Sequence, residues 1–163
     1  MTICRQQRYR YIRAVLILMA LLAAALSALG LSQDLPRSVR FELRLASMEK
    51  VEGWERVPGP EWAGTIIWIS PEAIVTNADV ARAWLDHGGD GKPCVGILLT
   101  EDGALKLARF TKTHVGENVA VMLNGRVTSI PKIMAEITGG RFIIAGNLTE
   151  EEAGAIAEGI MVK

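Results

Sequence analysis

The side chains that could support catalysis or metal binding are few, and they begin with two histidines, His87 and His114. His87 stands in the polar run Asp86-His87-Gly88-Gly89-Asp90-Gly91, which superficially resembles a metal- or phosphate-binding loop. The run lacks the alternating oxygen ligands and distal glutamate of a calcium loop, and it has no Gly-Lys-Ser/Thr end. The sequence therefore favours a tight polar turn after a helix at His87, and a surface position at a helix C-terminus for His114.

Other motifs of catalytic or metal sites are missing from the sequence. There is no Gly-x-Ser-x-Gly elbow and no His-Glu-x-x-His pair. The run Glu150-Glu151-Glu152 fits a helix N-terminus, where acids are stabilised by the helix dipole, and Cys94 beside an apolar run fits a buried position. We expect no catalytic residue, metal, cofactor or small-molecule substrate. An exported enzyme would need a pocket joining a histidine to Asp86, Asp90 or a glutamate.

The charges of the chain are distributed unevenly. Lysine plus arginine and aspartate plus glutamate each number 18 in 163 residues. Four arginines, but no acid, precede Asp34, so the remainder carries a net negative charge. Nucleic-acid binding calls for clustered lysine and arginine, so the sequence argues against a nucleic-acid partner.

The N-terminal segments predict membrane targeting. Residues 1–13 are basic, 14–31 are apolar and uncharged, and 32–38 form a short polar tether before a domain over 39–163. A basic flank followed by an apolar run is typical of an export signal whose N-terminus stays inside. The length of the run favours an uncleaved single-pass anchor with the domain on the extracytoplasmic side. A cleaved signal peptide, which would release a secreted or periplasmic domain, is the alternative.

The rest of the chain predicts an α+β domain with a largely antiparallel sheet and two to three packed helices. Expected strands cover Val39–Leu45, Thr65–Ile69, Pro93–Leu99, Ile133–Ile137 and Arg141–Ile144, and Glu49–Gly64 is a loop or irregular hairpin. Asn124-Gly125 predicts a type I′ turn within a hairpin over Asn118–Ile130. Helices are expected over Thr76–Trp84, after a Thr100 cap, and after Thr149 with Glu152 in the capping-box position.

Tryptophans outside the predicted helices are the first side chains to weigh as contacts for a partner. Trp54 and Trp62 lie in the Gly/Pro-rich stretch and Trp68 in a predicted strand. Exposed tryptophans are frequent hot spots of binding surfaces, whereas the structural alternative packs Trp68 in the core with the two loop tryptophans folded over it. The candidate contact residues for a polypeptide are Trp54, Trp62 and Met122.

An ordered series of motifs in the second half, from Leu99 to Ile160, resembles the head subdomain of the first extracytoplasmic domain of SecD-type protein-export membrane proteins. Alone, each motif is weakly specific, and together they span about 60 residues. The matching structural positions include Thr100, Gly103, Asn124, Gly125, Pro131, Gly139, Gly140, Thr149 and Glu152.

This resemblance implies a head-like domain that binds polypeptide in connection with protein export, without enzymatic activity. It implies a polypeptide or envelope-protein partner, with the translocon as one candidate. The family protein has several transmembrane helices and a separate base subdomain, so a chain with one apolar segment is not expected to use the proton-motive force itself. The alternative is a cell-envelope interaction or assembly protein that reuses the fold without an export role.

Overall fold

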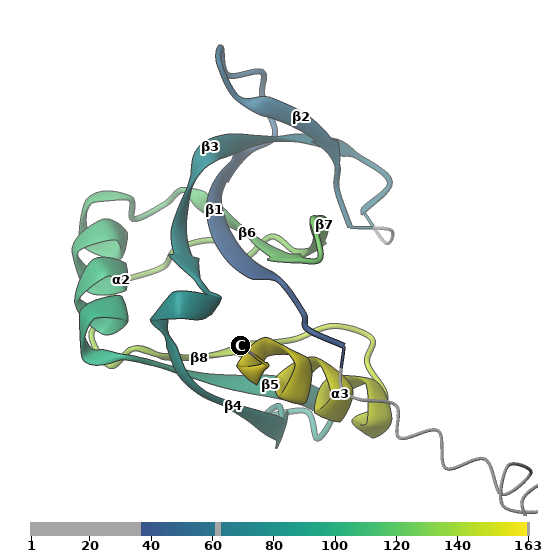
Figure 1. The fold of residues 1–163 in the computed structure, drawn as a ribbon. Helices are drawn as coiled ribbons and strands as arrows, with labels where there is room; N and C mark the ends of the chain where they lie inside the picture. Colours follow the sequence, from purple (N-terminus) through teal and green to yellow (C-terminus); the bar gives the residue numbers. More distant parts are fainter. Residues whose placement is uncertain (1–36, 61–62, 163) are drawn as a thin grey trace, which may run out of the picture. The chain divides into compact units, whose positions relative to one another are not determined.

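The computed structural model describes residues 37–60 and 63–162. The predicted anchor 14–31, and most of the tether 32–38, lie outside these residues. Among the residues that are described, no helix is long and apolar enough to cross a membrane. These residues form two antiparallel sheets and two α-helices (Figure 1).

The larger sheet, called sheet A here, has five antiparallel strands in the spatial order β2-β3-β1-β6-β7. Its central strand β1 confirms the prediction from the alternating residues Val39–Leu45, and it pairs with β3 on one side and β6 on the other. The strands of sheet A are β1 (Phe41–Ser47), β2 (Glu55–Pro58), β3 (Ile66–Thr76), β6 (Asn118–Leu123) and β7 (Arg126–Ser129).

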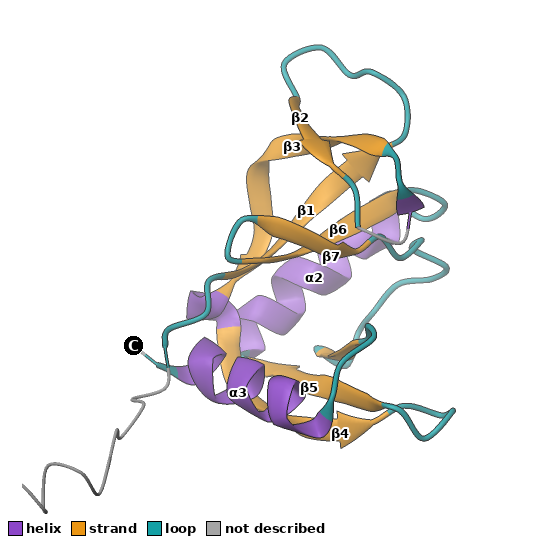
Figure 2. Cartoon of the chain, turned by 90° about the vertical axis from the view of Figure 1, so that its right-hand side faces the viewer, coloured by secondary structure: helices purple, strands orange, loops and turns teal. Residues whose placement is uncertain are grey.

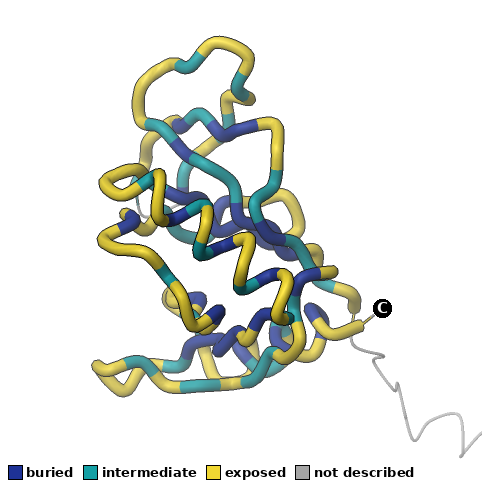
Figure 3. Tube along the Cα trace, turned by 90° about the vertical axis from the view of Figure 1, so that its left-hand side faces the viewer, coloured by how far each residue is buried: buried dark blue, intermediate teal, exposed yellow. Residues whose placement is uncertain are grey.

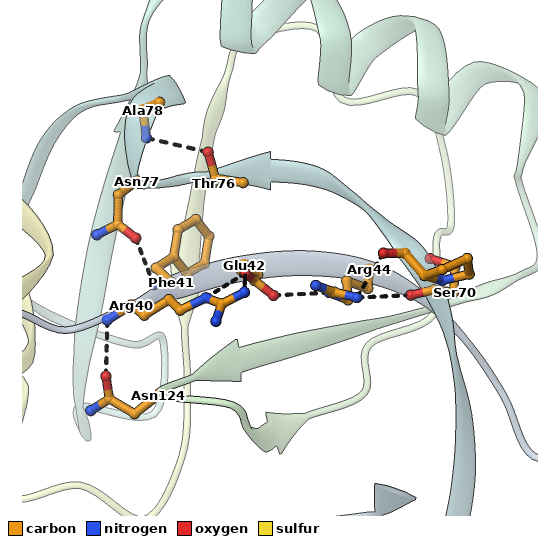
Figure 4. Close-up of polar contacts among 10 residues, drawn as sticks. Arg40, Phe41, Glu42, Arg44, Ser70, Thr76, Asn77, Ala78 and Asn124 are labelled. Carbon is orange, nitrogen blue, oxygen red and sulfur yellow. Dashed lines mark hydrogen bonds and ion pairs between the residues drawn. The ribbon is translucent and has the colours of Figure 1, made fainter. Parts of the chain in front are cut away.

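Strand β3 is longer than the sequence predicts. It begins as expected but continues past Ser70-Pro71, because bulges in its pairing with β1 accommodate these residues. The Nη1 atom of Arg44 donates to the carbonyls of Ser70 and Pro71 at 3.1 and 2.9 Å, so a side chain satisfies carbonyls where the strand pairing is irregular (Figure 4). The predicted loop Glu49–Gly64 contains β2, which pairs with β3 as an irregular hairpin.

Glu42 of β1 lies between Arg40, just before the strand, and Arg44 within it. Its carboxylate is buried and accepts hydrogen bonds from Arg40 at 2.6 Å and Arg44 at 2.9 Å (Figure 4). Burial opposes the ionised form, but the two guanidinium groups outweigh it and hold the pKa of Glu42 below its ordinary value. The three residues alternate along the strand, so they form a ladder of charge on one face of sheet A.

The helix predicted over Thr76–Trp84 is wrong beyond its first turn. The capping box of Thr76 and Asp79 is present, but it begins a single 3-10 turn, Asn77–Asp79, followed by strand β4 (Val80–His87). The capping signal is local, whereas β4 is fixed by its antiparallel pairing with β5 (Pro93–Leu99). His87 consequently ends a strand, not a helix.

The smaller sheet, called sheet B, has the order β4-β5-β8, with β8 at Arg141–Ile144. Strands β5 and β8 confirm predictions from the sequence. Helix α2 (Glu101–Thr113) begins after the Thr100 cap, and α3 (Glu150–Met161) begins after Thr149 with its full capping box. Figure 2 shows α3 lying along sheet B, while α2 runs between the levels of the two sheets.

The hairpin of β6 and β7 turns at Asn124-Gly125, as predicted. Both residues have positive φ, 51° and 77°, the requirement of a type I′ turn. The turn also meets the start of β1, because Asn124 donates its N–H to the Arg40 carbonyl at 2.8 Å and accepts from the Arg40 N–H through Oδ1 at 2.9 Å. The hairpin is therefore fixed to the centre of sheet A at its tip.

The main core lies between the inner faces of the two sheets and is closed by both helices. Its members include Phe41 and Val121 of sheet A, Ile97 of sheet B, Leu107 of α2 and Ala157 of α3. Buried residues recur along the inward side of α2 while its outer side is exposed (Figure 3). A second apolar cluster lies on the other face of sheet A: Ala46, Ile67, Ile69, Ala120, Met122 and Val127.

The predicted fold class is confirmed in its main features, an α+β arrangement with antiparallel strands. The difference is that the strands divide into two sheets. Two α-helices are described, with a 3-10 turn where a third was expected.

Candidate functional site

An apolar groove opens at the margin of the main core, between sheet A, α2 and β8, with a volume of about 510 Å³. Its floor comes from core-facing side chains of β1, β6 and α2, and its outer wall is the segment 131–137. Charged side chains are rare in its lining. The lining residues are Leu43, Leu107, Thr111, Val119, Val121, Pro131, Lys132, Ile133, Met134, Ala135, Glu136, Ile137, Phe142 and Ile143.

The first half of the segment 131–137 is bonded to the start of β6. The carbonyl of Pro131 accepts from the Val119 N–H at 2.9 Å. Ile133 donates to the Glu117 carbonyl and accepts from the Gly116 N–H, both at 2.8 Å. The side chain of Ile133 is buried in the main core. These bonds bring the segment to the mouth of the groove.

The second half of the segment leaves the sheet for α2. The N–H of Ile137 donates to Oγ1 of Thr111 at 2.9 Å, and that hydroxyl donates to the Leu107 carbonyl at 2.8 Å. The strand predicted over Ile133–Ile137 is therefore wrong. The backbone of this segment is hydrogen-bonded beside the start of β6 at Ile133 and to α2 at Ile137, so it does not pair with one strand along its length. Between the two attachments, Met134 is 79% exposed, the highest value of any large apolar side chain among the described residues.

Strand β8 borders the groove with a free edge. It pairs with β5 on one side, and no described strand pairs with its other side. Phe142 points inward and stacks on Phe41 with ring centroids 6.1 Å apart, while Ile143 is 46% exposed. An edge strand beside an apolar groove can accept an extended chain by strand addition.

Gly140 allows α2 to approach the beginning of β8. Its φ is +59°, and a Cβ there would lie 2.5 Å from the Cβ of Ala104. A Cβ at Gly139 would meet open space. Of the two glycines in the predicted Gly-Gly motif, the second is thus required by geometry, where α2 approaches the start of β8.

Other residues of the motif series pack closely against a neighbour or cap a helix. Gly103 lies so close to Asp79 that a Cβ there would be 2.8 Å from the Asp79 carbonyl oxygen. Burial disfavours the ionised Asp79, but hydrogen bonds from Lys106, at 2.6 Å, and from Thr76 outweigh it and lower the pKa of Asp79. The caps Thr100 and Thr149 begin the two helices.

The three contact candidates from the sequence are not brought together at the groove. Trp54 is half-buried just before β2, and Met122 is 5% exposed within the second cluster. Trp62 lies outside the described residues. Met134 and Ile143 were missed, because Ile133–Ile137 was interpreted as a strand and the exposure of a side chain on a free edge cannot be seen from periodicity.

His87 and His114 have different neighbours and do not share a site. His87 Nε2 lies 3.3 Å from Glu150 Oε1, and both side chains are exposed. His114 is at the C-terminal end of α2, where Nδ1 lies 2.8 Å from the Phe110 carbonyl and the ring stacks on Phe110. Within residues 37–60 and 63–162, no group of three or more His, Cys, Asp or Glu side chains is arranged to hold a metal ion.

Comparison with known proteins finds similarity to protein translocase subunits. The family model described as "SecDF, P1 head subdomain" matches residues 54–160. The protein translocase subunit SecD of Sebaldella termitidis is 36% identical over 84 residues, which are 52% of this chain and 21% of that protein. SecDF of Thermus thermophilus is 38% identical over 84 residues, 52% of this chain and 11% of that protein. The aligned part thus spans about a fifth or less of these relatives.

Solved structures of SecDF share the fold. A structure described as a membrane component SecDF that enhances protein export has a TM-score of 0.63 and 26% identity, covering 81% of this chain and 70% of that one. SecDF in its super-membrane-facing form has a TM-score of 0.62 and 25% identity, over 77% of this chain and 19% of that one.

Proposed function

Because this chain belongs to the SecDF P1 head subdomain family, we propose that it is a non-enzymatic extracytoplasmic domain that binds polypeptide in connection with protein export. The apolar segment 14–31 holds it at the membrane through the tether 32–38. The names of its relatives, protein translocase subunits SecD and SecDF, support the export context.

The apolar groove is the observation that carries the proposal. Its lining is almost entirely apolar, and it is open to solvent where Met134 is exposed. An unfolded exported chain presents apolar side chains and unpaired backbone groups together. The groove and the free edge of β8 offer a match to each of these, through side-chain burial and strand addition.

The two charges at the groove are of opposite sign, Lys132 and Glu136. A groove with balanced charge does not select strongly for acidic or basic segments. Its recognition would depend on apolar contact and on backbone hydrogen bonds, which vary little with sequence. Such recognition suits a domain that meets many different exported chains.

Site-specific photocrosslinking in native membranes tests the proposal. A photoreactive amino acid replaces Met134 in the full-length chain, and the matched control replaces Leu105, an exposed apolar residue on α2 outside the groove. Crosslinks from position 134 to many exported polypeptides, with few from 105, are expected. Crosslinks from 134 to a single envelope protein, or only to another copy, would instead support an assembly role.

A binding measurement isolates the contribution of the groove. Met134→Asp places a charge at the mouth of the groove, where the exposed side chain contributes little to the core. Its affinity for a permanently unfolded, fluorescently labelled polypeptide is expected to fall about tenfold, and Leu105→Asp is expected to leave it unchanged. Equal affinities of the two variants would contradict binding at this groove.

A further inference from the structure

The outer face of sheet B, turned away from the core, carries an unusual set of side chains. Antiparallel register places Trp84 opposite Gly96 and Gly96 opposite Ile143, and it places Leu98 between Arg82 and Arg141. We call this surface the Trp84 face. Its residues are Arg82, Trp84 and Asp86 of β4, Cys94, Gly96 and Leu98 of β5, and Arg141 and Ile143 of β8.

Trp84 lies flat across the sheet. A Cβ at Gly96 would collide with the indole ring, so the glycine makes room for it. Two guanidinium groups lie over the ring, that of Arg82 at 5.5 Å and that of Arg141 at 5.1 Å from the ring centroid. The indole Nε1–H donates to Asp86 at 3.1 Å. The aromatic ring and both cations are therefore held in place before any partner arrives.

The Trp84 face combines apolar exposure with positive charge. Leu98 is 39% and Ile143 46% exposed on it. Asp86 lies 3.6 Å from Arg141, whereas Arg82 has no ion pair among the described residues. Two cations against one carboxylate leave a net positive face on a domain whose overall charge is negative. Tryptophan with arginine and exposed aliphatic side chains is the composition of a membrane–water interface.

The Trp84 face also lies at the end of the fold where the chain enters. The N–H of Val39 donates to the Gly159 carbonyl of α3 at 2.8 Å, and α3 packs on the opposite side of sheet B. Sheet B and the first described residues share one end of the unit, and the β2–β3 hairpin occupies the other (Figure 1). The seven tether residues reach at most about 25 Å, so an anchor over 14–31 would keep the first described residues within that distance of the bilayer surface.

We infer that the Trp84 face binds the anionic surface of the lipid bilayer, with Arg82 and Arg141 at lipid phosphates and with Trp84, Leu98 and Ile143 beside them at the headgroup level. The inference rests on the proposed anchoring of segment 14–31. A polypeptide ligand for the Trp84 face is the competing occupant, but an anionic lipid surface matches its net charge and its place near the anchor.

Quenching by lipid-borne spin labels tests the contact on the full-length chain in vesicles. A fluorophore is attached at Leu98→Cys in a Cys4→Ser background, because Cys94 is buried and its thiol pKa is raised by burial and by nearby Asp86 and Asp90. The control label is at Glu52→Cys, in the exposed loop before β2. Vesicles contain phosphatidylcholine alone or mixed equally with phosphatidylglycerol, with headgroup-proximal doxyl lipid in both.

In anionic vesicles, the label at position 98 is expected to be quenched at least about twofold more than the label at position 52. In neutral vesicles, this difference between the two labels should be smaller. Arg82→Gln with Arg141→Gln should abolish the difference, while circular dichroism confirms the fold of this variant. Equal quenching at 98 and 52 in chains that resist a carbonate wash would overturn the lipid contact alone. Loss of the chain in that wash would overturn the anchoring and the contact together. Protection of position 98 only by added unfolded polypeptide would assign the face to that partner instead.

Discussion

The hydroxyl of Thr111 accepts a hydrogen bond of 2.9 Å from the backbone N–H of Ile137, joining the last turn of α2 to the outer wall of the groove. Thr111 is 1% exposed and lies 26 residues from its partner along the sequence. One buried hydroxyl thus fixes where the wall stands relative to the helix.

Thr111→Val is expected to destabilise the fold by about 1–3 kcal/mol, because it leaves the Ile137 N–H without its partner. The matched control, Thr111→Ser, keeps the hydroxyl and should lose less. Urea unfolding measures the free energy of unfolding, and hydrogen exchange at Ile137 should quicken in the valine variant alone. Unchanged exchange there would show that the bond does not hold the wall.

Gly140→Ala is expected to cost about 1–3 kcal/mol, because it combines a positive φ with a collision against Ala104. Gly139→Ala, one residue earlier and facing open space, is the control and should change the free energy of unfolding little. Adding Ala104→Gly should restore part of the loss, since it removes the collision but not the backbone strain. Thermal or urea unfolding of the wild type and these three variants provides the comparison.

Glu42→Gln is expected to lower stability by about 1–3 kcal/mol at neutral pH, because the two arginines lose a buried anionic partner. The pKa of Glu42 is lowered in the fold, so its stabilisation is present above the unfolded value of about 4.3 and is lost as pH falls through the folded pKa. The difference between wild type and variant should therefore shrink below pH of about 4 in urea unfolding. A constant difference across pH would contradict this. Glu49→Gln, at an exposed glutamate, is the control.

Asn124 has two roles, its positive φ in the turn and its acceptor for the Arg40 N–H, and a pair of substitutions separates them. Asn124→Gly keeps the positive φ but removes the acceptor for the Arg40 N–H, and it should cost about 1 kcal/mol. Asn124→Ala loses both and should cost about 1–2 kcal/mol. The free energies of unfolding of the two variants measure this. Equal losses would mean that backbone strain at the turn contributes nothing.

What the sequence predicts correctly here are features determined by neighbouring residues. Asn124-Gly125 needs only its own two residues to form the turn, and Thr149 needs only Glu152 to complete its cap. The Thr76 and Asp79 cap is of the same kind, and it is present. The helix expected after it is absent, because Val80 to His87 pair with a strand that follows later in the chain.

The groove and the Trp84 face depend on partners distant in sequence, so periodicity could not predict them. Ile137 leaves the sheet because Thr111 holds its N–H, and Trp84 lies flat because Gly96 faces it from the next strand. The alternation of Arg82, Trp84 and Asp86 was available in the sequence as a strand signal, but the preceding capping box favoured a helix. Exposure at Met134 follows from the same long-range arrangement.

Asn77 holds the beginning and the end of the fold together. Its side-chain amide donates to the carbonyls of Val39 and Ile160, at 2.8 and 3.0 Å, and its Oδ1 accepts from the Phe41 N–H at 2.7 Å (Figure 4). Mechanical tension applied between residues 39 and 160 would therefore load this one amide and the Val39–Gly159 bond before it reached either sheet.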